Sequence, residues 1–278
     1  MTDAGIQADA AAKLLDPLTD LVAQAGAAIL AIDRANMGTI DKPDGSPVTA
    51  ADLAADGVIA DGLARLAAGV FALSEESCGR GLPAGQRSYF LIDPLDGTKE
   101  YVAGRDEFTV NIALLTDGQP LLGVVGAPAL GLIWRGVVGA GAERLTMRAD
   151  GTITGAPTAI RTRQLPQHQP CIVAVSRSHG DAATAAFVDL RPGAVRHKVG
   201  SAVKFCRVAE GSADIYPRLA PTHAWDVAAG HAVVAAAGGR VTDSRGRPLT
   251  FGDTRGDFII PEFIAWGDPA AAPRAGAA

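Results

Sequence analysis

The sequence predicts an α/β protein, with an α+β first half, built from stacked layers of helix and sheet. Apolar residues recur at helical spacing in several segments, and short runs of strand-forming residues that end at turn residues lie between these segments. The 278 residues are enough for one large domain or two closely packed subdomains. A hydrophobic content of 48% with 20% charged residues indicates a globular protein.

The first half, residues 1–160, is expected to contain two helices followed by a run of strands. Apolar spacing predicts helices over Leu14–Arg34 and Ala50–Leu66, with Leu53 among the core residues of the second. Strands are expected at 69–74, 89–92, 107–116, 119–127 and 131–138, the third and fourth joined as a hairpin around Asp117-Gly118. Segment 139–143 is expected to be a turn. Segment 148–169 is polar and is expected to be a loop that contains the subdomain boundary.

The second half, residues 161–278, is expected to be an α/β unit. Helices are expected at 182–190, at 202–210 with Ser201 as N-cap, and from Asp226 to a glycine pair at 238–239. Strands are expected at 171–175, 194–199, 213–216, 240–243, 248–250 and 258–265. The tail, 268–278, is rich in proline, alanine and glycine and is expected to be disordered.

Charge and cysteine content limit the possible classes of function. The net charge of −5 argues against a nucleic-acid partner. Three scattered cysteines fit neither a disulfide framework nor a zinc site, so we expect a reducing, cytoplasmic location. The N-terminal residues lack a signal-peptide pattern and no stretch is apolar enough to span a bilayer, whereas peripheral membrane association stays open. The oligomeric state, monomer or homodimer, is also open.

A strand that ends in two acids, YFLIDPLDGTKEY at 89–101, is the most informative stretch. Asp93 and Asp96 lie three residues apart at the end of an apolar run, and Thr98 follows. Such carboxylates repel each other unless a cation lies between them, and oxygen ligands suit Mg²⁺. Taken alone, the segment could be only a turn, since these are common turn residues. An EF-hand is excluded, because loop position twelve counted from Asp93 is Gly104.

Further acids stand at the ends of other predicted elements. Glu75 and Glu76 end the strand before Tyr89, so one of them reaches Asp93 if the two strands are neighbours. Asp226 begins a helix and Asp52 lies in the first turn of another. Both acids could also only complement the dipole of their helix.

The order and spacing of these acidic motifs resemble the inositol monophosphatase superfamily, which are Mg²⁺-dependent, lithium-sensitive phosphomonoesterases with the sugar-phosphatase fold. The resemblance runs from Ser46 to Gly267. Finer motifs resemble the bacterial 3′(2′),5′-bisphosphate nucleotidases, which remove the 3′-phosphate of 3′-phosphoadenosine 5′-phosphate, a by-product of sulfate activation. These motifs are DGTKEY at 96–101, EFTVNIAL at 107–114, SRSH at 176–179, KFCRVAEG at 204–211 and APTHAWD at 220–226.

The resemblance implies a role for each site residue. Glu75, Asp93 and the Leu95 carbonyl would bind one Mg²⁺, and Asp93, Asp96 and Asp226 a second. Asp52 and Thr98 would orient and deprotonate the attacking water. Glu76 would hold a third, weaker ion or support the other ligands. The expected substrate contacts are Gly97, Thr98, Ser176, His179, Gly200, Ser201, Lys204 and Asp226.

Several of these assignments have alternatives. Ser176 and His179 follow a buried strand and could hold phosphate or ribose, but His179 could equally be a surface residue. Lys204 could meet a 5′-phosphate as a point charge, beside free N–H groups at Gly200 and Ser201, or be a solvated surface lysine. The rival functions are an inositol-1-monophosphatase or another small phosphomonoesterase, and, in a different class, a non-catalytic metal- or phosphate-binding protein.

Overall fold

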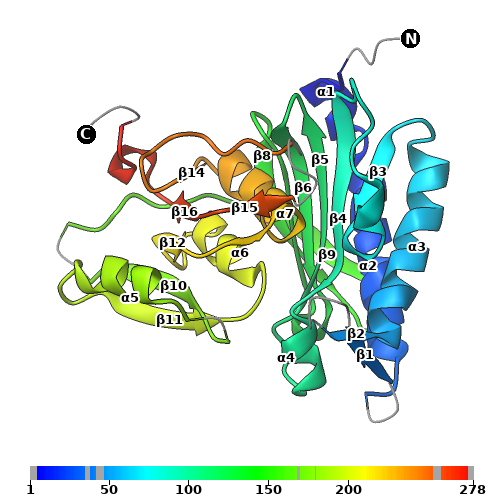
Figure 1. The fold of residues 1–278 in the computed structure, drawn as a ribbon, viewed down its shortest axis with the longest axis horizontal. Helices are drawn as coiled ribbons and strands as arrows, with labels where there is room; N and C mark the ends of the chain where they lie inside the picture. Colours follow the sequence, from blue (N-terminus) through cyan, green and yellow to red (C-terminus); the bar gives the residue numbers. More distant parts are fainter. Residues whose placement is uncertain are drawn as a thin grey trace.

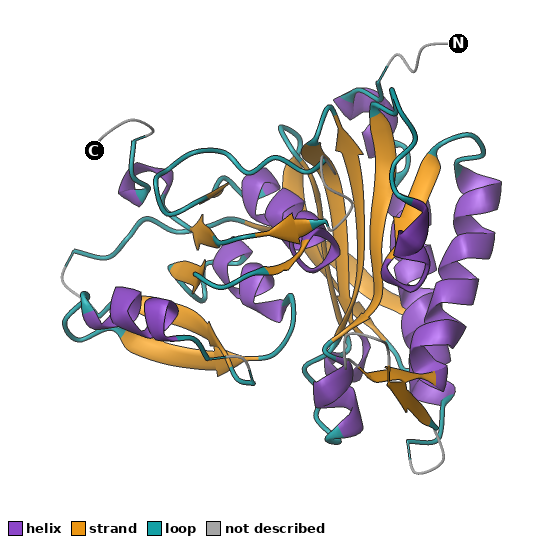
Figure 2. Ribbon diagram, in the orientation of Figure 1, coloured by secondary structure: helices purple, strands orange, loops and turns teal. Residues whose placement is uncertain are grey.

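Layers of helix and sheet alternate through the molecule (Figure 1, Figure 2), which confirms the predicted fold class. The computed structural model describes residues 5–34, 38–41, 47–167, 170–178, 180–252 and 258–274. Helices α2 (Leu15–Ala31) and α3 (Ala50–Leu66) cover one face of a large sheet, and α6 (Val203–Ala209) and α7 (Ala224–Ala236) lie on its other side. A smaller sheet follows, and α5 (Ala182–Asp189) packs beyond it.

The large sheet has seven strands in the order β3-β4-β5-β6-β7-β8-β9. Its strands are β3 (Phe71–Ser74), β4 (Ser88–Asp96), β5 (Thr109–Thr116), β6 (Gln119–Ala127), β7 (Leu132–Val137), β8 (Gly141–Met147) and β9 (Ile153–Ile160). Only β3 and β4 pair in parallel among neighbouring strands of this sheet, with Ser74 opposite Ile92. This register places Glu75 beside Asp93, as the sequence predicted.

The two faces of the large sheet carry different cores. On β5, Ile112 and Leu114 belong to the core under α2 and α3, whereas Ala113 and Leu115 belong to the core under α7. Gly123 on β6 lets α7 approach closely, since a Cβ there would lie 2.2 Å from the Ala229 carbonyl oxygen. The helix therefore crosses the sheet with its first turns over β4 and β5.

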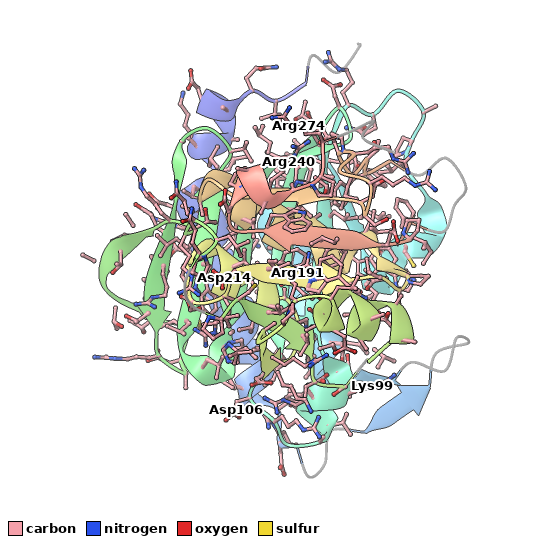
Figure 3. All side chains as sticks on the ribbon, turned by 90° about the vertical axis from the view of Figure 1, so that its left-hand side faces the viewer. Lys99, Asp106, Arg191, Asp214, Arg240 and Arg274 are labelled. Atoms are coloured by element: carbon pink, nitrogen blue, oxygen red, sulfur yellow. The ribbon has the colours of Figure 1, made fainter. Side chains whose placement is uncertain are left out.

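The smaller sheet has five strands in the order β11-β10-β12-β16-β14. These strands are β10 (Ile172–Ser176), β11 (Val195–Val199), β12 (Ile215–Arg218), β14 (Arg240–Thr242) and β16 (Phe263–Trp266). Asp214, just before β12, binds the Arg163 guanidinium with a 2.7 Å contact, and Figure 3 labels both Asp214 and Arg191.

Short elements complete the described chain. They are α1 (Ala8–Ala12), the hairpin β1 (Thr39–Asp41) and β2 (Pro47–Thr49), the 3-10 helix η1 (Glu75–Arg80), α4 (Thr98–Val102), η2 (Pro128–Leu130), the ribbon β13 (Thr222–His223) and β15 (Ile259–Ile260), and η3 (Pro269–Ala271). Lys99 of α4 and nearby Asp106 lie at the lower end of the view in Figure 3.

The structure corrects several sequence expectations. Strands β8 and β9 occupy much of the segments 139–143 and 148–169, which were predicted to be a turn and a loop. Residues 248–250 form only an isolated bridge through Pro248, and the predicted strand 258–265 is divided between β15 and β16. The described part of the tail is ordered, because Asp268 caps η3 and binds the Leu165 N–H.

Two residues have other environments than predicted. Leu53 is 55% exposed and does not contribute to the core. Ser201 is not a helix cap: α6 begins after Ala202, and Ser201 has a left-handed φ of 46°. The division into residues 1–160 and 161–278 stays a proposal. Helix α7, which belongs to the second part, packs on the large sheet of the first part.

Candidate active site

The end of β4 brings two of the predicted acids together. Between Asp93 and Asp96 the pairing with β5 shifts register, so that both acids come to the same site. The Leu95 N–H donates to Asp93 Oδ1 at 3.0 Å. Gly97 then turns the chain into α4 with a φ of 91°, and a Cβ there would lie 2.1 Å from Ser201 Oγ. Glycine is therefore required at this position.

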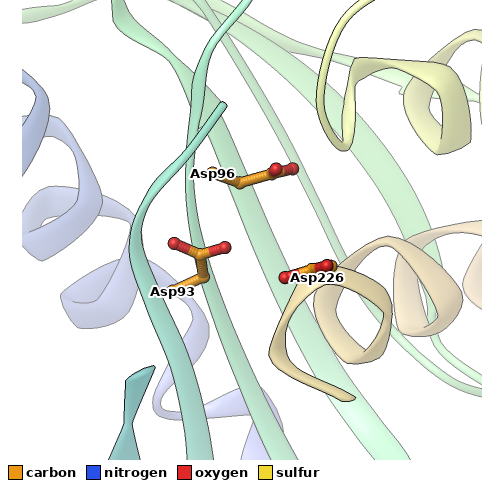
Figure 4. Close-up of side chains that lie close together, drawn as sticks. All are labelled: Asp93, Asp96 and Asp226. Carbon is orange, nitrogen blue, oxygen red and sulfur yellow. The ribbon is translucent and has the colours of Figure 1, made fainter. Parts of the chain in front are cut away.

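Asp226 joins these acids from the other half of the chain. It lies in the first turn of α7, where the helix dipole favours a carboxylate, and it accepts a hydrogen bond from the Thr222 hydroxyl. One carboxylate oxygen from each of Asp93, Asp96 and Asp226 lies within 4.8 Å of the others (Figure 4). The structure thus assembles the acidic cluster that the sequence predicted.

The electrostatics of this cluster are unfavourable without a cation. Burial, with the charges of Glu75 and Asp96, raises the pKa of Asp93 well above its usual range. Burial, with the charge of Asp226, raises the pKa of Asp96 to about 7, and Lys204 opposes this rise. Glu75 lines the same pocket. A set of buried carboxylates that disfavour one another, with only oxygen donors, fits a hard divalent cation.

Asp52 and Thr98 form a hydrogen-bonded pair beside the cluster. Asp52 is 3% exposed and lies in a capping box, in which its Oδ2 accepts from the N–H and hydroxyl of Thr49 at 2.8 and 2.6 Å. Its other oxygen accepts from Thr98 Oγ1 at 3.0 Å. The Leu95 carbonyl oxygen is 3.2 Å from the same hydroxyl. The capping box therefore fixes the carboxylate that Thr98 contacts.

Lys204 lies inside the protein and not on its surface, which excludes the solvated alternative. Its side chain is 3% exposed, and Nζ donates to the Ser201 carbonyl oxygen at 2.6 Å and lies 5.2 Å from the Tyr216 ring centroid. Burial lowers its pKa to about 8, although Asp96 favours the charged form. Lys204 is therefore an internal cation that lines the pocket next to the acids.

Sequence reasoning missed a second cation, Arg218. This residue ends β12 and lines the pocket, and its Nη2 donates to the Pro221 carbonyl oxygen at 3.2 Å. Its buried Nε has no hydrogen-bond partner in the described part of the chain. In the sequence, Arg218 lies between the predicted strand 213–216 and the motif APTHAWD at 220–226. Its position beside Lys204 depends on the fold.

Glu107 ties the two halves of the chain together next to the site. It accepts a bidentate pair of contacts from Arg177, each 2.8 Å long, and a 2.8 Å hydrogen bond from the Gly200 N–H. Ser201 Oγ contacts the carbonyl oxygens of Asp96 and Glu107 at 2.8 and 2.9 Å. The N–H of Gly200 is thus engaged and not free for an anion, contrary to the expectation, and the hydroxyl of Ser201 is engaged as well.

The SRSH segment lies partly at the pocket. Ser176 lines it, and Ser178 donates to the carboxylate of Glu100, a pocket residue that is 3% exposed. Arg105 contacts the same Ser178 hydroxyl at 3.1 Å. His179, predicted as a substrate contact, lies outside the described residues. Glu76 begins η1 beside Glu75, and its role with a third ion stays a prediction.

A cavity of about 320 Å³ lies at the acidic cluster, and residues of both halves line it. Its wall combines the acids with Lys204, Arg218 and an aromatic pair, His223 and Trp225, whose rings stack 4.6 Å apart. None of the helices in the described ranges has the length and apolar character needed to cross a membrane.

The sequence model of the inositol monophosphatase family matches residues 10–262. This chain belongs to that family. The 3′(2′),5′-bisphosphate nucleotidase CysQ of Escherichia coli strain K12 is 41% identical over 254 residues, which cover 90% of this chain and 98% of that protein. These matches confirm the predicted superfamily and the resemblance to its bisphosphate nucleotidase branch.

Solved structures show the same fold. CysQ from Bacteroides thetaiotaomicron, described as a bacterial member of the inositol monophosphatase family, superposes with a TM-score of 0.74 at 32% identity over 93% of this chain and 97% of that one. Inositol monophosphatase from Anabaena superposes with a TM-score of 0.70 at 27% identity, covering 93% and 92%. The family name and the names of these relatives denote phosphoric monoester hydrolases, so the predicted enzyme class is confirmed.

Proposed function

We propose that this protein is a Mg²⁺-dependent 3′(2′),5′-bisphosphate nucleotidase that hydrolyses 3′-phosphoadenosine 5′-phosphate to AMP and inorganic phosphate. One observation carries the proposal: a single pocket holds an acidic cluster, the Thr98 hydroxyl, which donates a hydrogen bond to Asp52, and two cationic side chains, Lys204 and Arg218. A substrate with two phosphates needs acidic residues that hold cations at the phosphate to be removed, and a cationic side chain at the other phosphate. The name of the Escherichia coli relative agrees with this assignment.

The acidic residues divide into two overlapping ligand sets in this proposal. Glu75, Asp93 and the Leu95 carbonyl would hold one Mg²⁺, and Asp93, Asp96 and Asp226 a second. Two bound divalent ions stabilise the attacking and leaving oxygens of an in-line displacement and lower the pKa of bound water. Inhibition by lithium and a cytoplasmic location, both expected from the sequence, belong to the same proposal.

Thr98 and Asp52 supply a route for the proton of the attacking water. Because Oδ2 of Asp52 is occupied by Thr49, Oδ1 remains to accept the hydroxyl proton of Thr98. The lone pairs of Thr98 Oγ1 can then accept a proton from the water molecule while the oxygen of that water attacks the 3′-phosphorus. The bond between phosphorus and the ribose 3′-oxygen breaks, the 3′-oxygen takes up a proton from solvent water, and Asp52 returns the proton it accepted to solvent as phosphate and AMP are released.

Lys204 and Arg218 are the candidates for contact with the second phosphate. Lys204 has two carbonyl partners, at Val199 and Ser201, which leaves its third N–H available. The Arg218 Nε is also unpartnered within the described residues. Arginine binds phosphate through paired N–H groups, whereas lysine acts as a point charge. Arg218 is therefore the stronger candidate for a direct contact.

Phosphate release from a panel of monoesters tests the function. We expect hydrolysis of 3′-phosphoadenosine 5′-phosphate with Mg²⁺, little hydrolysis after chelation, and slower hydrolysis of inositol 1-phosphate. Arg218→Ala should raise KM for the bisphosphate about tenfold, as for the loss of one charge-assisted contact of about 1.4 kcal/mol, and leave inositol 1-phosphate unaffected. A wild-type preference for inositol 1-phosphate would reject the nucleotidase assignment but not the metal chemistry.

A further inference from the structure

Asn111 on β5 is a buried polar residue whose side-chain amide has no hydrogen-bond partner among the described residues. Its side chain is fully buried, and neither Oδ1 nor Nδ2 has a partner in the described part of the chain. A buried amide without partners destabilises the fold, because its polar atoms lose their hydrogen bonds to water and gain none in return. A strand residue that only filled space would be apolar, like Ile112 and Ala113 beside it.

The position of Asn111 relates it to the acidic cluster. In the pairing of β4 with β5, Asn111 lies directly opposite Asp93. Ala113 and Leu115, two and four residues further along β5, face the core under α7, and strand alternation puts Asn111 on that same face. Tyr89 and Leu91 place the Asp93 side chain on this face too. Cβ atoms of such opposed residues are about 4.5–5.5 Å apart, within reach of an amide–carboxylate hydrogen bond.

Helix α7 packs on β4 and β5, the two strands that carry Asp93 and Asn111, and its first turn carries Asp226. The Asn111 side chain is not among the residues that line the pocket. Asp93 is the proposed metal ligand that the strand register places next to Asn111.

We propose that Asn111 is a positioning residue for the metal site: its Nδ2–H donates to the carboxylate of Asp93 when a divalent cation is bound, and thereby holds that carboxylate toward the cation. Metal-ligating carboxylates are generally themselves hydrogen-bonded, and loss of such a partner typically weakens metal affinity 10–100-fold. Asp93 has one such donor already, the Leu95 N–H at Oδ1, and Asn111 supplies a second. The inference rests on the proposed metal site.

Asn111→Leu tests this role, because leucine matches the branching of asparagine but cannot hydrogen-bond. In the chelator-treated protein the variant should melt at the same temperature as wild type or higher, since an unsatisfied amide is removed. In the same variant Mg²⁺ should raise the melting temperature less than in wild type. By calorimetric titration its Kd for Mg²⁺ should be about tenfold higher.

Leu115→Val is the matched control. It lies on the same strand and the same face, is fully buried and has no polar atom. It should lower the metal-free melting temperature and leave the Kd for Mg²⁺ unchanged. Asn111→Val, which is smaller, replaces Asn111→Leu if leucine does not fit.

The possible outcomes separate this inference from the function it rests on. If wild type does not bind Mg²⁺, the metal site itself is wrong. If wild type binds Mg²⁺ and Asn111→Leu binds it equally well, only the role of Asn111 is overturned. The role is also overturned if Asn111→Leu and Asn111→Val both melt at a lower temperature than wild type without metal, or both fail to fold. The amide of Asn111 would then stabilise the metal-free fold.

Discussion

Asp93 is buried and Asp96 half-buried, and their carboxyl groups lie too close together to ionise freely. Their pKa values are raised, that of Asp96 to about 7. A group whose pKa is higher in the folded than in the unfolded state binds more protons when folded, so stability falls as pH rises between the two values. The metal-free protein should therefore be less stable at pH 8 than at pH 5.

Melting temperatures measured at both pH values with a chelator check this expectation. Mg²⁺ should remove most of the loss at pH 8, because a bound cation stabilises the ionised carboxylates. Asp93→Asn should reduce the pH dependence of the metal-free protein, abolish Mg²⁺ stabilisation and abolish activity. Near-normal turnover in folded Asp93→Asn would contradict the two-ion assignment.

Thr98 is predicted to act on the water and not on substrate affinity. Thr98→Ala removes the hydroxyl that contacts Asp52 and should lower kcat by 10²–10⁴-fold with KM nearly unchanged, as is typical for loss of acid–base assistance. Thr98→Ser keeps the hydroxyl and serves as the control, with most of the activity retained. Steady-state kinetics with saturating Mg²⁺ measure both constants; an effect confined to KM would assign Thr98 to binding instead.

At the scale of elements, α7 decides where Asp226 lies. The helix is almost entirely buried, and glycines at 123 and 136 on the sheet below let it pack directly on the strand backbone. Its fixed contact with β6 places its first turn, and Asp226, over β4. The same burial encloses His231, which lies in the middle of α7, 5.6 Å from the Phe251 ring, with an unpartnered Nδ1 in the described structure.

His231 should make the fold sensitive to acid. Burial lowers the pKa of His231 to about 4 from an ordinary value of 6.5. Because protonation is then more favourable in the unfolded state, the contribution of His231 to stability falls as pH drops from 6.5 toward 4 and no further below that. The loss at pH 5 should be about 2 kcal/mol.

Denaturant unfolding of His231→Leu at pH 7 and pH 5 measures this contribution. The variant should lose less stability than wild type over this interval, whatever its stability at pH 7. His197 is exposed on β11, so His197→Leu should keep the full wild-type pH dependence. Equal pH dependence in wild type and His231→Leu would show that other groups are responsible.

At the scale of the whole molecule, the site exists only while the two halves keep their relative position. Glu107 joins them through Arg177 and the Gly200 N–H, next to Asp96 and Lys204. Glu107→Ala removes these contacts and should lower kcat/KM at least tenfold, because small displacements of catalytic groups are costly. The exposed pair Arg196–Asp189 is the control: Asp189→Asn should leave kcat/KM unchanged. Unchanged kinetics in Glu107→Ala would mean that core packing alone fixes the two halves.

The sequence alone determined the elements whose pattern is local, and the acids attached to them. Helices α2 and α3, strand β4 and the hairpin of β5 and β6 follow from apolar spacing and turn residues within each segment. The acids at 75, 93, 96 and 226 stand at the ends of such elements. The strand ends predicted that Glu75 or Glu76 approaches Asp93 and Asp96, and the resemblance to the inositol monophosphatase superfamily implied that Asp226 joins them. Strand β9 was missed because most of its residues are exposed and polar or small, and only pairing with β8 makes it a strand.

Only the tertiary structure decided which polar side chains are buried, and against what. Lys204 has the sequence context of a surface lysine, but Tyr216 and Asp96, from two other strands, enclose it. Arg218, Glu107 and Asn111 have no local pattern that distinguishes them from other polar strand or loop residues. Their roles arise from partners that are distant in sequence, because burial and charge depend on the atoms that folding brings within a few ångströms.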